Sequence, residues 1–292
     1  AYYDNRTGDE AQWDMEQVAA DLLGGYDFLN ELFDDVEIPA PEQQGGDELP
    51  EDPAEVLREK WGVEYGDLWQ IGDHRILCGD STKKEDVDRL LDGAEVGAII
   101  TDPPYGIGID GQKKSTNKNP KHNRKHHEFR GWDQDRPGSE VFLSILSMGC
   151  AVGIWGGNYF ADMLPPSRGW VYWSKGQDGL SMSDGELAWT NTSQPLRCVT
   201  VNRGALIGSM HPTQKPVEVM EFLIKYVKPE PGGGPLLDLF AGSGTTFVAA
   251  HNESRICYAM EIDPAYVAVC LERMAQLGYE PERVANVKNV MV

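Results

Sequence analysis

A buried strand that runs directly into Asp102-Pro103-Pro104-Tyr105 is the feature that most constrains this chain. The apolar run at residues 96–100 predicts that strand, because continuous apolar residues are typical of parallel strands covered on both faces. Open α/β sheets bind their ligands beyond the carboxyl ends of such strands, where Asp102 stands. The two prolines fix φ and remove two amide donors, so the turn offers carbonyl acceptors beside a carboxylate and an aromatic ring. These groups suit an exocyclic amino group on a planar base.

A glycine turn follows a second predicted strand at residues 235–239. Gly242 and Gly244 allow the backbone to approach a ligand closely, and the helix that begins after them adds partial positive charge. A further predicted strand at residues 255–260 ends at Glu261, nineteen residues past Gly242. An acid at about that distance holds the ribose diol in Rossmann-like nucleotide sites. Pro264, well placed in a first turn, predicts a helix that continues to Gln276.

The glycine turn could belong to one of three kinds of nucleotide site. A phosphate-binding P-loop requires lysine after its last glycine, and Gly244 is followed by Thr245. A dinucleotide fingerprint requires a small residue where Phe247 stands, which weakens that alternative. S-adenosylmethionine contains a ribose and no phosphate, so it needs neither feature.

Together with the block from His211 to Pro216, these motifs resemble the permuted β class of amino-methylating DNA methyltransferases. In that class the Asp-Pro-Pro-Tyr motif precedes the glycine motif. The resemblance covers roughly residues 61–274 and includes Gly79-Asp80-Ser81. It implies the doubly wound, Rossmann-like α/β fold of S-adenosylmethionine-dependent methyltransferases. The sheet would be mostly parallel with one reversed strand, and the motif order would be circularly permuted.

The resemblance also implies roles for individual residues. Asp102 and the Pro103 carbonyl would accept hydrogen bonds from the target amine, and Tyr105 would stack on a base flipped out of the duplex. Glu261 would hold the cofactor ribose, and the methyl group would pass without a metal or a covalent intermediate. Asp80 and Ser81 would contact the cofactor adenine, and Lys215 its methionine carboxylate. The full expected sets are catalytic Asp102, Pro103, Pro104 and Tyr105, and cofactor-binding Asp80, Ser81, Asp102, Lys215, Asp238, Phe240, Gly242, Ser243, Gly244, Thr245 and Glu261.

Aspartate at position 102 bears on the identity of the target base. In the resembled class, Asp-Pro-Pro-Tyr usually accompanies adenine N6, whereas serine in the first position is more usual for cytosine N4. We therefore predict an adenine-N6-specific DNA methyltransferase, with cytosine N4 and RNA guanine N2 as alternative targets. A partition-type DNA-binding module is the non-enzymatic alternative, and intact Asp102, Tyr105 and Glu261 argue against it. Cytosine C5 methylation is excluded, since it needs a Pro-Cys dipeptide and none of the five cysteines follows a proline.

The net charge of −21 is concentrated at the N-terminus. Residues 1–60 hold 18 acidic and three basic residues, so they carry −15, and the other 232 residues carry −6. A basic segment at residues 107–135 follows the Asp102 turn and would neutralise DNA phosphates; a solvated charged loop is the alternative. Its cationic residues are Lys113, Lys114, Lys118, Lys121, Arg124, Lys125 and Arg130.

The domain organisation follows from these patterns. Residues 1–60 are predicted to form an acidic helical appendage and linker, and residues 4–14 also resemble the tail of a ParB-like domain. Residues 61–292 would form the methyltransferase domain. Within it, residues 176–210 leave room for a small target-recognition region only, and few base contacts imply a short or relaxed recognition sequence. The sequence does not decide whether the protein forms a homodimer or acts with a companion restriction nuclease.

Composition bounds the remaining possibilities. The 292 residues are 40% hydrophobic, enough for one large α/β core. No apolar stretch approaches twenty residues and no signal peptide opens the chain, so we expect a cytoplasmic protein without a membrane partner. The cysteines are odd in number and form no Cys-x-x-Cys, which indicates reduced thiols. His122 and His126 have helical spacing, but no acid or cysteine at ligand spacing accompanies them, so no metal is expected.

Overall fold

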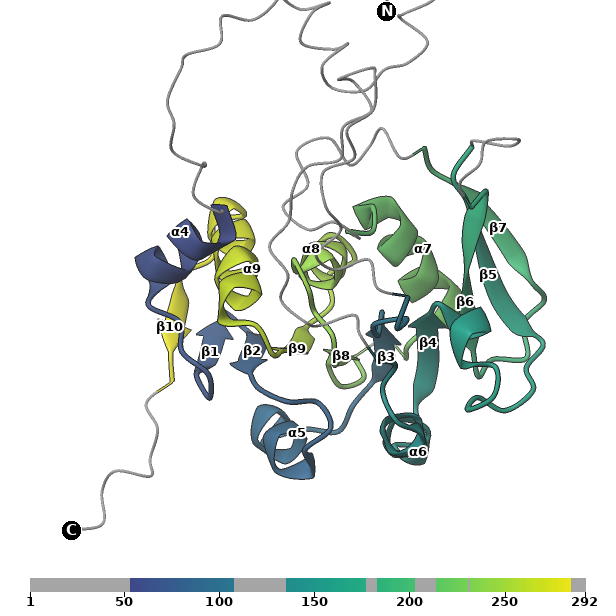
Figure 1. Cartoon of the computed structure of the whole chain (residues 1–292), viewed down its shortest axis with the longest axis horizontal. Coiled ribbons are helices and arrows are strands. Elements are labelled where there is room, and N and C mark those ends of the chain that lie inside the picture. Colours follow the sequence, from purple (N-terminus) through teal and green to yellow (C-terminus); the bar gives the residue numbers. More distant parts are fainter. Residues whose placement is uncertain (1–52, 108–134, 177–182, 203–213, 231, 285–292) are drawn as a thin grey trace, which may run out of the picture. The chain divides into compact units, whose positions relative to one another are not determined.

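The computed structural model describes residues 53–107, 135–176, 183–202, 214–230 and 232–284. Outside these ranges lie the acidic arm to residue 52 with its ParB-like features, all seven cationic residues of the basic segment, and the histidines at 122, 126 and 127. The predictions made for those residues stay predictions. The label numbers used below are those of Figure 1.

Ten strands of the described chain form a single sheet in the order β10-β1-β2-β9-β8-β3-β4-β6-β5-β7. In chain order the strands are β1 (Leu68–Ile71), β2 (His74–Cys78), β3 (Ala98–Thr101), β4 (Ala151–Trp155), β5 (Gly169–Ser174), β6 (Gly185–Thr190), β7 (Arg197–Thr200), β8 (Leu236–Asp238), β9 (Cys257–Glu261) and β10 (Pro281–Arg283). The central five, from β2 to β4, are mutually parallel. The predicted α/β class with a mostly parallel sheet is therefore confirmed.

Two strands of this sheet run against the rest, where one was predicted. β6 is antiparallel to both β4 and β5, and β1 is antiparallel to both β2 and β10. The second reversal has a local cause. Ile71 pairs with His74, so only two residues connect β1 to β2, and Gly72 adopts φ 57° between them. A two-residue hairpin joins antiparallel strands only, and its positive φ favours glycine.

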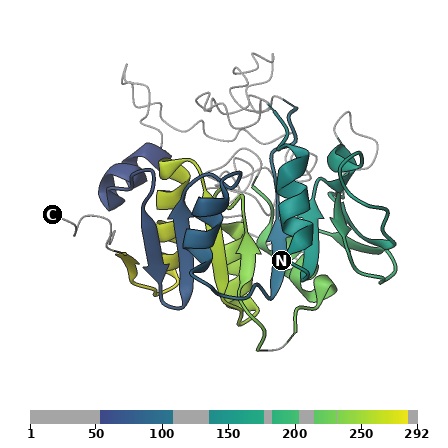
Figure 2. The same cartoon turned by 90° about the horizontal axis from the view of Figure 1, so that it is seen from below.

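Helices cover both faces of the sheet, as Figures 1 and 2 show. The helices are α4 (Pro53–Trp61), α5 (Lys84–Leu91), α6 (Ser139–Ser147), the short 3₁₀ helix η2 (Gly157–Phe160), α7 (Val217–Val227), α8 (Thr245–Asn252) and α9 (Pro264–Gln276). One face carries α4, α9, α8 and α7, and the other carries α5 and α6. The bounds predicted for the helix that follows Glu261 are confirmed by α9.

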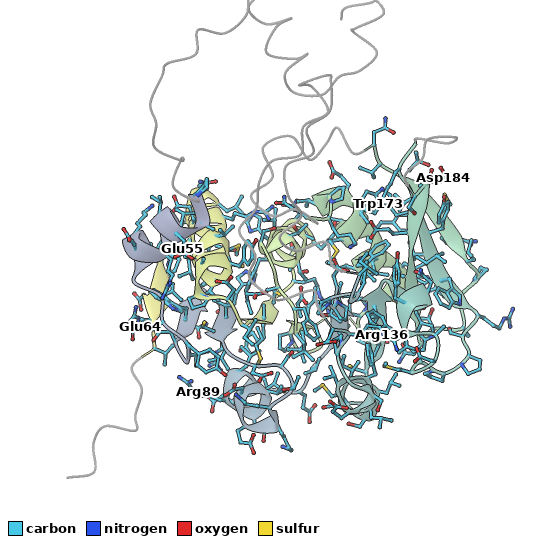
Figure 3. The ribbon with its side chains drawn as sticks, viewed as in Figure 1. Glu55, Glu64, Arg89, Arg136, Trp173 and Asp184 are labelled. Carbon is cyan, nitrogen blue, oxygen red and sulfur yellow. The ribbon has the colours of Figure 1, made fainter. Side chains whose placement is uncertain are left out.

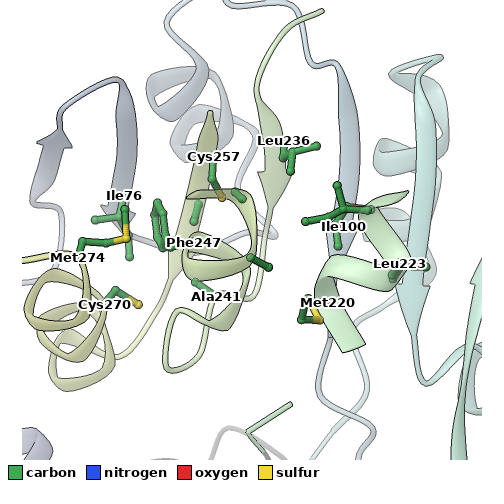
Figure 4. Close-up of a cluster of buried hydrophobic side chains, with 14 of the residues drawn as sticks. Ile76, Ile100, Met220, Leu223, Leu236, Ala241, Phe247, Cys257, Cys270 and Met274 are labelled. Carbon is green, nitrogen blue, oxygen red and sulfur yellow. The ribbon is translucent and has the colours of Figure 1, made fainter. Parts of the chain in front are cut away.

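Alternate residues of the central strands enter two different cores. Ile100 and Leu236 pack with Met220 and Phe247 beneath α7 and α8, where Figure 4 labels them. The intervening residues Ile99 and Leu237 point to the opposite core with α5 and α6. Because both faces are covered, these strands consist of continuous apolar residues, the pattern that predicted them.

Helix α4 packs against α9, although the sequence placed all but its last residue in the appendage. Ala54 lies in one cluster with Tyr266 and Val269, and the Trp61 indole donates to Glu272 Oε2 at 2.9 Å. The predicted boundary after residue 60 therefore falls within the last turn of a helix that belongs to the core.

No helix in the described ranges has the length and apolar character needed to cross a bilayer. All five cysteines are free thiols, and Cys78, Cys257 and Cys270 are buried.

Candidate functional site

The two motif-bearing turns leave the same edge of the sheet. Strands β3 and β8 are parallel neighbours, with Ala98 opposite Leu236 and Ile99 opposite Leu237. At the ends of these strands, the Thr101 hydroxyl donates to Asp238 Oδ1 at 2.8 Å. Parallel strands end at one edge, so the turn that begins at Asp102 lies beside the turn that begins at Leu239.

A cavity of about 330 Å³ opens between these turns. Of the residues predicted for the catalytic and cofactor sites, all but Gly244 line it. The lining residues are Gly79, Asp80, Ser81, Asp102, Pro103, Pro104, Tyr105, Gln214, Lys215, Met220, Asp238, Leu239, Phe240, Ala241, Gly242, Ser243, Thr245, Thr246, Glu261, Ile262 and Tyr266. Gly244 instead begins α8 with φ 78° and packs tightly against Cys270.

Glu261 and Gly242 form one end of the cavity. Glu261 Oε2 accepts the Gly242 N–H at 2.8 Å, and Oε1 accepts the Asp263 N–H at 2.9 Å. Burial raises the pKa of the Glu261 carboxyl to about 7, although these N–H groups favour its ionised form. Gly242 adopts φ 51°, and a Cβ added to it would meet nothing within 4 Å. The backbone at this turn is therefore open to a ligand.

Asp238 connects the two turns through its carboxylate, which lies at the end of β8. Its Oδ1 accepts the Thr101 hydroxyl at 2.8 Å and the Phe240 N–H at 3.1 Å, and its Oδ2 accepts the Thr246 hydroxyl at 2.5 Å. The side chain is fully enclosed, and burial raises its pKa to about 6. Because all its oxygens are engaged, Asp238 is placed to fix the geometry of the cavity floor.

Asp80 lies at the end of the cavity nearest β2. Its Oδ1 accepts the Thr82 hydroxyl at 2.7 Å and the Thr82 N–H at 3.0 Å, and Lys83 lies 3.4 Å from Oδ2. Burial opposes ionisation, but the Thr82 hydrogen bonds and Lys83 hold the pKa of this carboxyl below its usual range. Asp80 is therefore an ionised acceptor within the cavity wall.

The Asp102 carboxylate is engaged on both oxygens. Its Oδ1 accepts the Tyr105 hydroxyl at 2.7 Å, and its Oδ2 lies 2.6 Å from Lys215 Nζ. Burial raises the pKa of Asp102, and Lys215 opposes that shift. Lys215 was expected near the methionine carboxylate of a cofactor; here it pairs with a carboxylate of the protein.

Tyr105 is held from several sides. Its hydroxyl accepts a hydrogen bond from Lys215 Nζ at 3.0 Å, and its ring stacks on Tyr159 with centroids 4.6 Å apart and planes inclined by 15°. Gly156, with φ 69°, lies directly against the ring edge. Arg136 holds η2 in place, because it donates a hydrogen bond to the Tyr159 carbonyl and forms a salt bridge with Asp162.

Three residues of this site escaped the sequence analysis. Glu186 on β6 pairs with Lys215 at 3.0 Å and with Lys175 at 2.8 Å, and Tyr159 covers the Tyr105 ring. Glu186 lies between Gly185 and Leu187, and Lys175 follows Ser174, so neither belongs to a motif and no local signal distinguishes them. Tyr159 follows the end of β4, at the edge where ligands bind, but no motif marks it in the sequence.

Comparison with known proteins adds an independent finding. Residues 154–272 match the N6_N4_Mtase family, described as DNA methylase. This region includes the glycine turn and Glu261, whereas the Asp102 turn precedes it. A stretch of 79 residues is 33% identical to the type II methyltransferase M.PvuII of Proteus hauseri and covers 27% of this chain. The chain matches less than a quarter of that relative's length, 23%.

Two solved structures resemble the fold at low identity. The complex of M1.HpyAVI with S-adenosylmethionine is 18% identical, over 68% of this chain and 98% of that one, with a TM-score of 0.46. The PvuII DNA methyltransferase, named as cytosine-N4-specific, is 18% identical, over 69% of this chain and 90% of that one, with a TM-score of 0.39.

Proposed function

We propose that this protein, whose residues 154–272 match the N6/N4 DNA methylase family, is a DNA methyltransferase that uses S-adenosylmethionine and methylates adenine N6. The observation that carries the proposal is the shared cavity. A turn of acceptors at Asp102 and a glycine turn at Gly242 come from distant parts of the chain, and both line it. A methyl donor and an amine acceptor have to meet in one such space.

The cavity residues fit S-adenosylmethionine. Glu261 presents a buried carboxylate for ribose hydroxyls, and the exposed backbone at Gly242 allows close approach. Phe240 and Ile262 supply apolar walls for a planar ring, and Asp80 accepts hydrogen bonds at the same end. When bound, this cofactor supplies an electrophilic methyl group on a sulfonium.

The chain's own residues would prepare the amine. Asp102 accepts one amine N–H and the Pro103 carbonyl accepts the other, which draws the nitrogen toward sp³ geometry and frees its lone pair. Pro104 stiffens this turn, so the acceptors do not reorganise during the reaction. Tyr105 provides an aromatic surface for a flipped-out base, since the amine cannot be reached inside a stacked duplex.

The decisive experiment is methyl transfer from tritiated cofactor to DNA, followed by identification of the methylated nucleoside. N6-methyladenine supports the proposal in full. Absence of transfer to any DNA, with intact folding and cofactor binding, would sink it. Transfer to guanine in RNA, and to no base in DNA, would show that the substrate is RNA.

Asp102→Ala tests the assigned chemistry. The variant removes the acceptor for the amine but no group that holds the ribose, so transfer should fall about 100-fold or more while cofactor binding stays intact. Single-turnover transfer and calorimetric titration with the cofactor measure the two quantities. Full turnover in the variant would overturn the role of Asp102.

Cytosine N4 is a second candidate target. It is favoured by the stretch that is 33% identical to M.PvuII, because the PvuII enzyme is named as cytosine-N4-specific. Adenine is preferred because aspartate, and not serine, precedes the two prolines. The same nucleoside analysis separates the two bases.

The proposal extends to DNA contact and sequence recognition. Cationic residues between Lys113 and Arg130 would neutralise phosphates beside the cavity. Residues 176–210 include β6 and β7, so much of the stretch left for base contacts builds the sheet. We therefore expect a short or relaxed recognition sequence, and methylation mapping of a treated genome that returned a site of six or more defined base pairs would contradict this.

A further inference from the structure

Glu186 is a charged residue inside the site that belongs to none of its motifs. Its side chain is 21% exposed, and each of its oxygens has its own cationic partner. Oε1 lies 2.8 Å from Lys175 Nζ, and Oε2 lies 3.0 Å from Lys215 Nζ. These lysines are more enclosed than Glu186, at 9% and 6% exposed.

The hairpin of β5 and β6 sets this arrangement. Glu186 lies opposite Trp173, and the Lys175 N–H donates to the Asp184 carbonyl at 2.9 Å. Trp173 and Asp184 lie at the same end of that hairpin in Figure 3. The Lys175 ammonium also lies 5.2 Å from the centroid of the Trp173 ring, a cation–π contact. Lys175 is thus a fixed anchor for Glu186.

Lys215 is shared between two carboxylates. Its ammonium has three N–H groups, and three acceptors surround it: Asp102 Oδ2 at 2.6 Å, Glu186 Oε2 at 3.0 Å and the Tyr105 hydroxyl at 3.0 Å. In this state Asp102 has one oxygen on Lys215 and the other on Tyr105. An incoming amine must therefore compete for a carboxylate that already has partners.

We propose that Glu186 is a positioning residue that acts through Lys215: it retains the ammonium when the Asp102 carboxylate turns to the target amine. This inference rests on the proposed function. A buried ammonium that lost its only carboxylate would carry a large desolvation cost, and that cost would hold Lys215 on Asp102. With Glu186 as a second partner, Lys215 can release Asp102 Oδ2 without being left unpaired.

The charges of the cluster support this role. Asp102 and Glu186 balance Lys175 and Lys215, so a neutral amine can enter without creating a net buried charge. Although burial opposes ionisation, Lys215 and Lys175 lower the pKa of Glu186 to about 2, so it stays ionised in any ordinary assay. Glu186→Gln would leave one excess positive charge, which would bind Lys215 more firmly to Asp102.

The test compares wild type with Glu186→Gln in single-turnover methyl transfer at saturating DNA and cofactor. The expected rate is about 10- to 100-fold lower, with cofactor affinity within twofold. The melting temperature should fall, because the buried Lys175 loses its carboxylate, so the rates are compared below the melting transition of both proteins. Glu253→Gln is the matched control, because Glu253 is similarly enclosed at 19% exposed and pairs with Lys225 outside the cavity lining. Its rate should equal that of wild type.

A double-mutant cycle with Lys215→Gln shows whether Glu186 acts through Lys215. If it does, Glu186→Gln has no further effect in the Lys215→Gln background; independent effects would multiply and overturn the assignment. Lys175→Met gives a second measure should Glu186→Gln not fold, with an expected fall of about threefold or more at unchanged cofactor affinity. If the Glu186→Gln rate is within twofold of the wild-type rate, the positioning role is refuted and the proposed function is unaffected. The same conclusion follows if cofactor affinity falls as much as the rate. An inactive wild type counts against the proposed function itself.

Discussion

At the scale of single residues, four acids in one cavity differ because their neighbours differ. Asp80 receives the Thr82 hydrogen bonds and the charge of Lys83, so its pKa falls. Asp238 and Glu261 receive only neutral donors, and burial raises their pKa values to about 6 and about 7. Asp102 shares its lysine with Glu186. The residue type fixes the chemistry available, and the contacts decide which protonation state is present.

Glu261 should make cofactor binding pH-dependent. Ribose hydroxyls donate to an ionised carboxylate, so binding favours the charged form of a group whose pKa is about 7. Affinity is expected to rise between pH 6 and pH 8, with about a tenfold change per pH unit below pH 7. Calorimetric titration measures it. Glu261→Gln should bind more weakly and lose this dependence, and a flat wild-type profile would contradict the prediction.

Gly156 should be intolerant of a side chain. Its φ of 69° strains any other residue, and an added Cβ would overlap the Tyr105 ring. Gly156→Ala is therefore expected to displace Tyr105 and lower methyl transfer about tenfold or more. Gly149→Ala is the control, since Gly149 has φ 70° and no atom within 4 Å of its added Cβ. That variant should lose about 1 kcal/mol of stability and no activity. Equal activities of the two variants would refute the role of the ring contact.

At the scale of elements, the parallel pair of β3 and β8 brings residues 102 and 242 to one cavity. Strand pairing alone sets the direction and spacing of the two turns, and the Thr101–Asp238 hydrogen bond then ties their starting points together. Helix α9 shows the other kind of control, which is local. The Asp263 side chain accepts the Ala265 N–H at 2.8 Å, and Pro264 occupies the first turn, so this helix begins where its sequence predicts.

Thr101→Val tests the tie between β3 and β8. The substitution keeps the shape of the side chain but removes the donor to Asp238 Oδ1, so the free energy of unfolding should fall by about 1–2 kcal/mol. Methyl transfer should also fall, because the two turns lose a shared anchor. Thr200→Val, on the exposed edge strand β7, should change stability by less than about 0.5 kcal/mol. Urea denaturation compares the variants, and equal stabilities would show that the tie contributes nothing.

At the scale of the whole molecule, a hydrogen-bonded chain connects the sheet to helix α8 and to the segment that follows α9. His74 Nδ1 accepts the Cys257 N–H at 3.1 Å, which leaves the proton on Nε2 to face the Tyr279 hydroxyl at 3.2 Å. That hydroxyl lies 2.9 Å from His251 Nδ1, which accepts its proton. Burial, with a smaller contribution from His251, lowers the pKa of His74 to about 4. The folded state therefore requires a neutral imidazole.

The stability of the fold should decrease below pH 6.5 through His74. The unfolded chain binds a proton at about pH 6.5 and the folded chain at about pH 4, so folding loses about 2–3 kcal/mol as the pH falls across that interval. Asp238 and Glu261 have raised pKa values and act in the opposite direction, so a variant is needed to isolate the effect. His74→Asn retains the acceptor for Cys257. Its unfolding free energy should decline less between pH 6.5 and pH 4.5 than that of wild type; parallel curves would disprove the assignment.

The amino-acid sequence alone determined the features that depend on neighbouring residues. Apolar runs predicted the central strands, the Asp263–Pro264 start predicted α9, and the spacing from Gly242 to Glu261 predicted a nucleoside-binding end of a cavity. These signals are local, since backbone restriction, capping and periodicity act over a few positions. The cavity lining then brought together every residue predicted for the catalytic and cofactor sites except Gly244.

Only the tertiary structure decided which distant side chains meet. The contact of Lys215 with Asp102 and Glu186 depends on strand order, because β6 returns antiparallel beside β4 and carries Glu186 to the end of β3. The second reversed strand and the packing of α4 on α9 likewise follow from pairing and burial across the whole chain. The residues next to a side chain in the sequence do not indicate such partners. These contacts form only when segments that are distant in the sequence pack together and bury each other's surfaces.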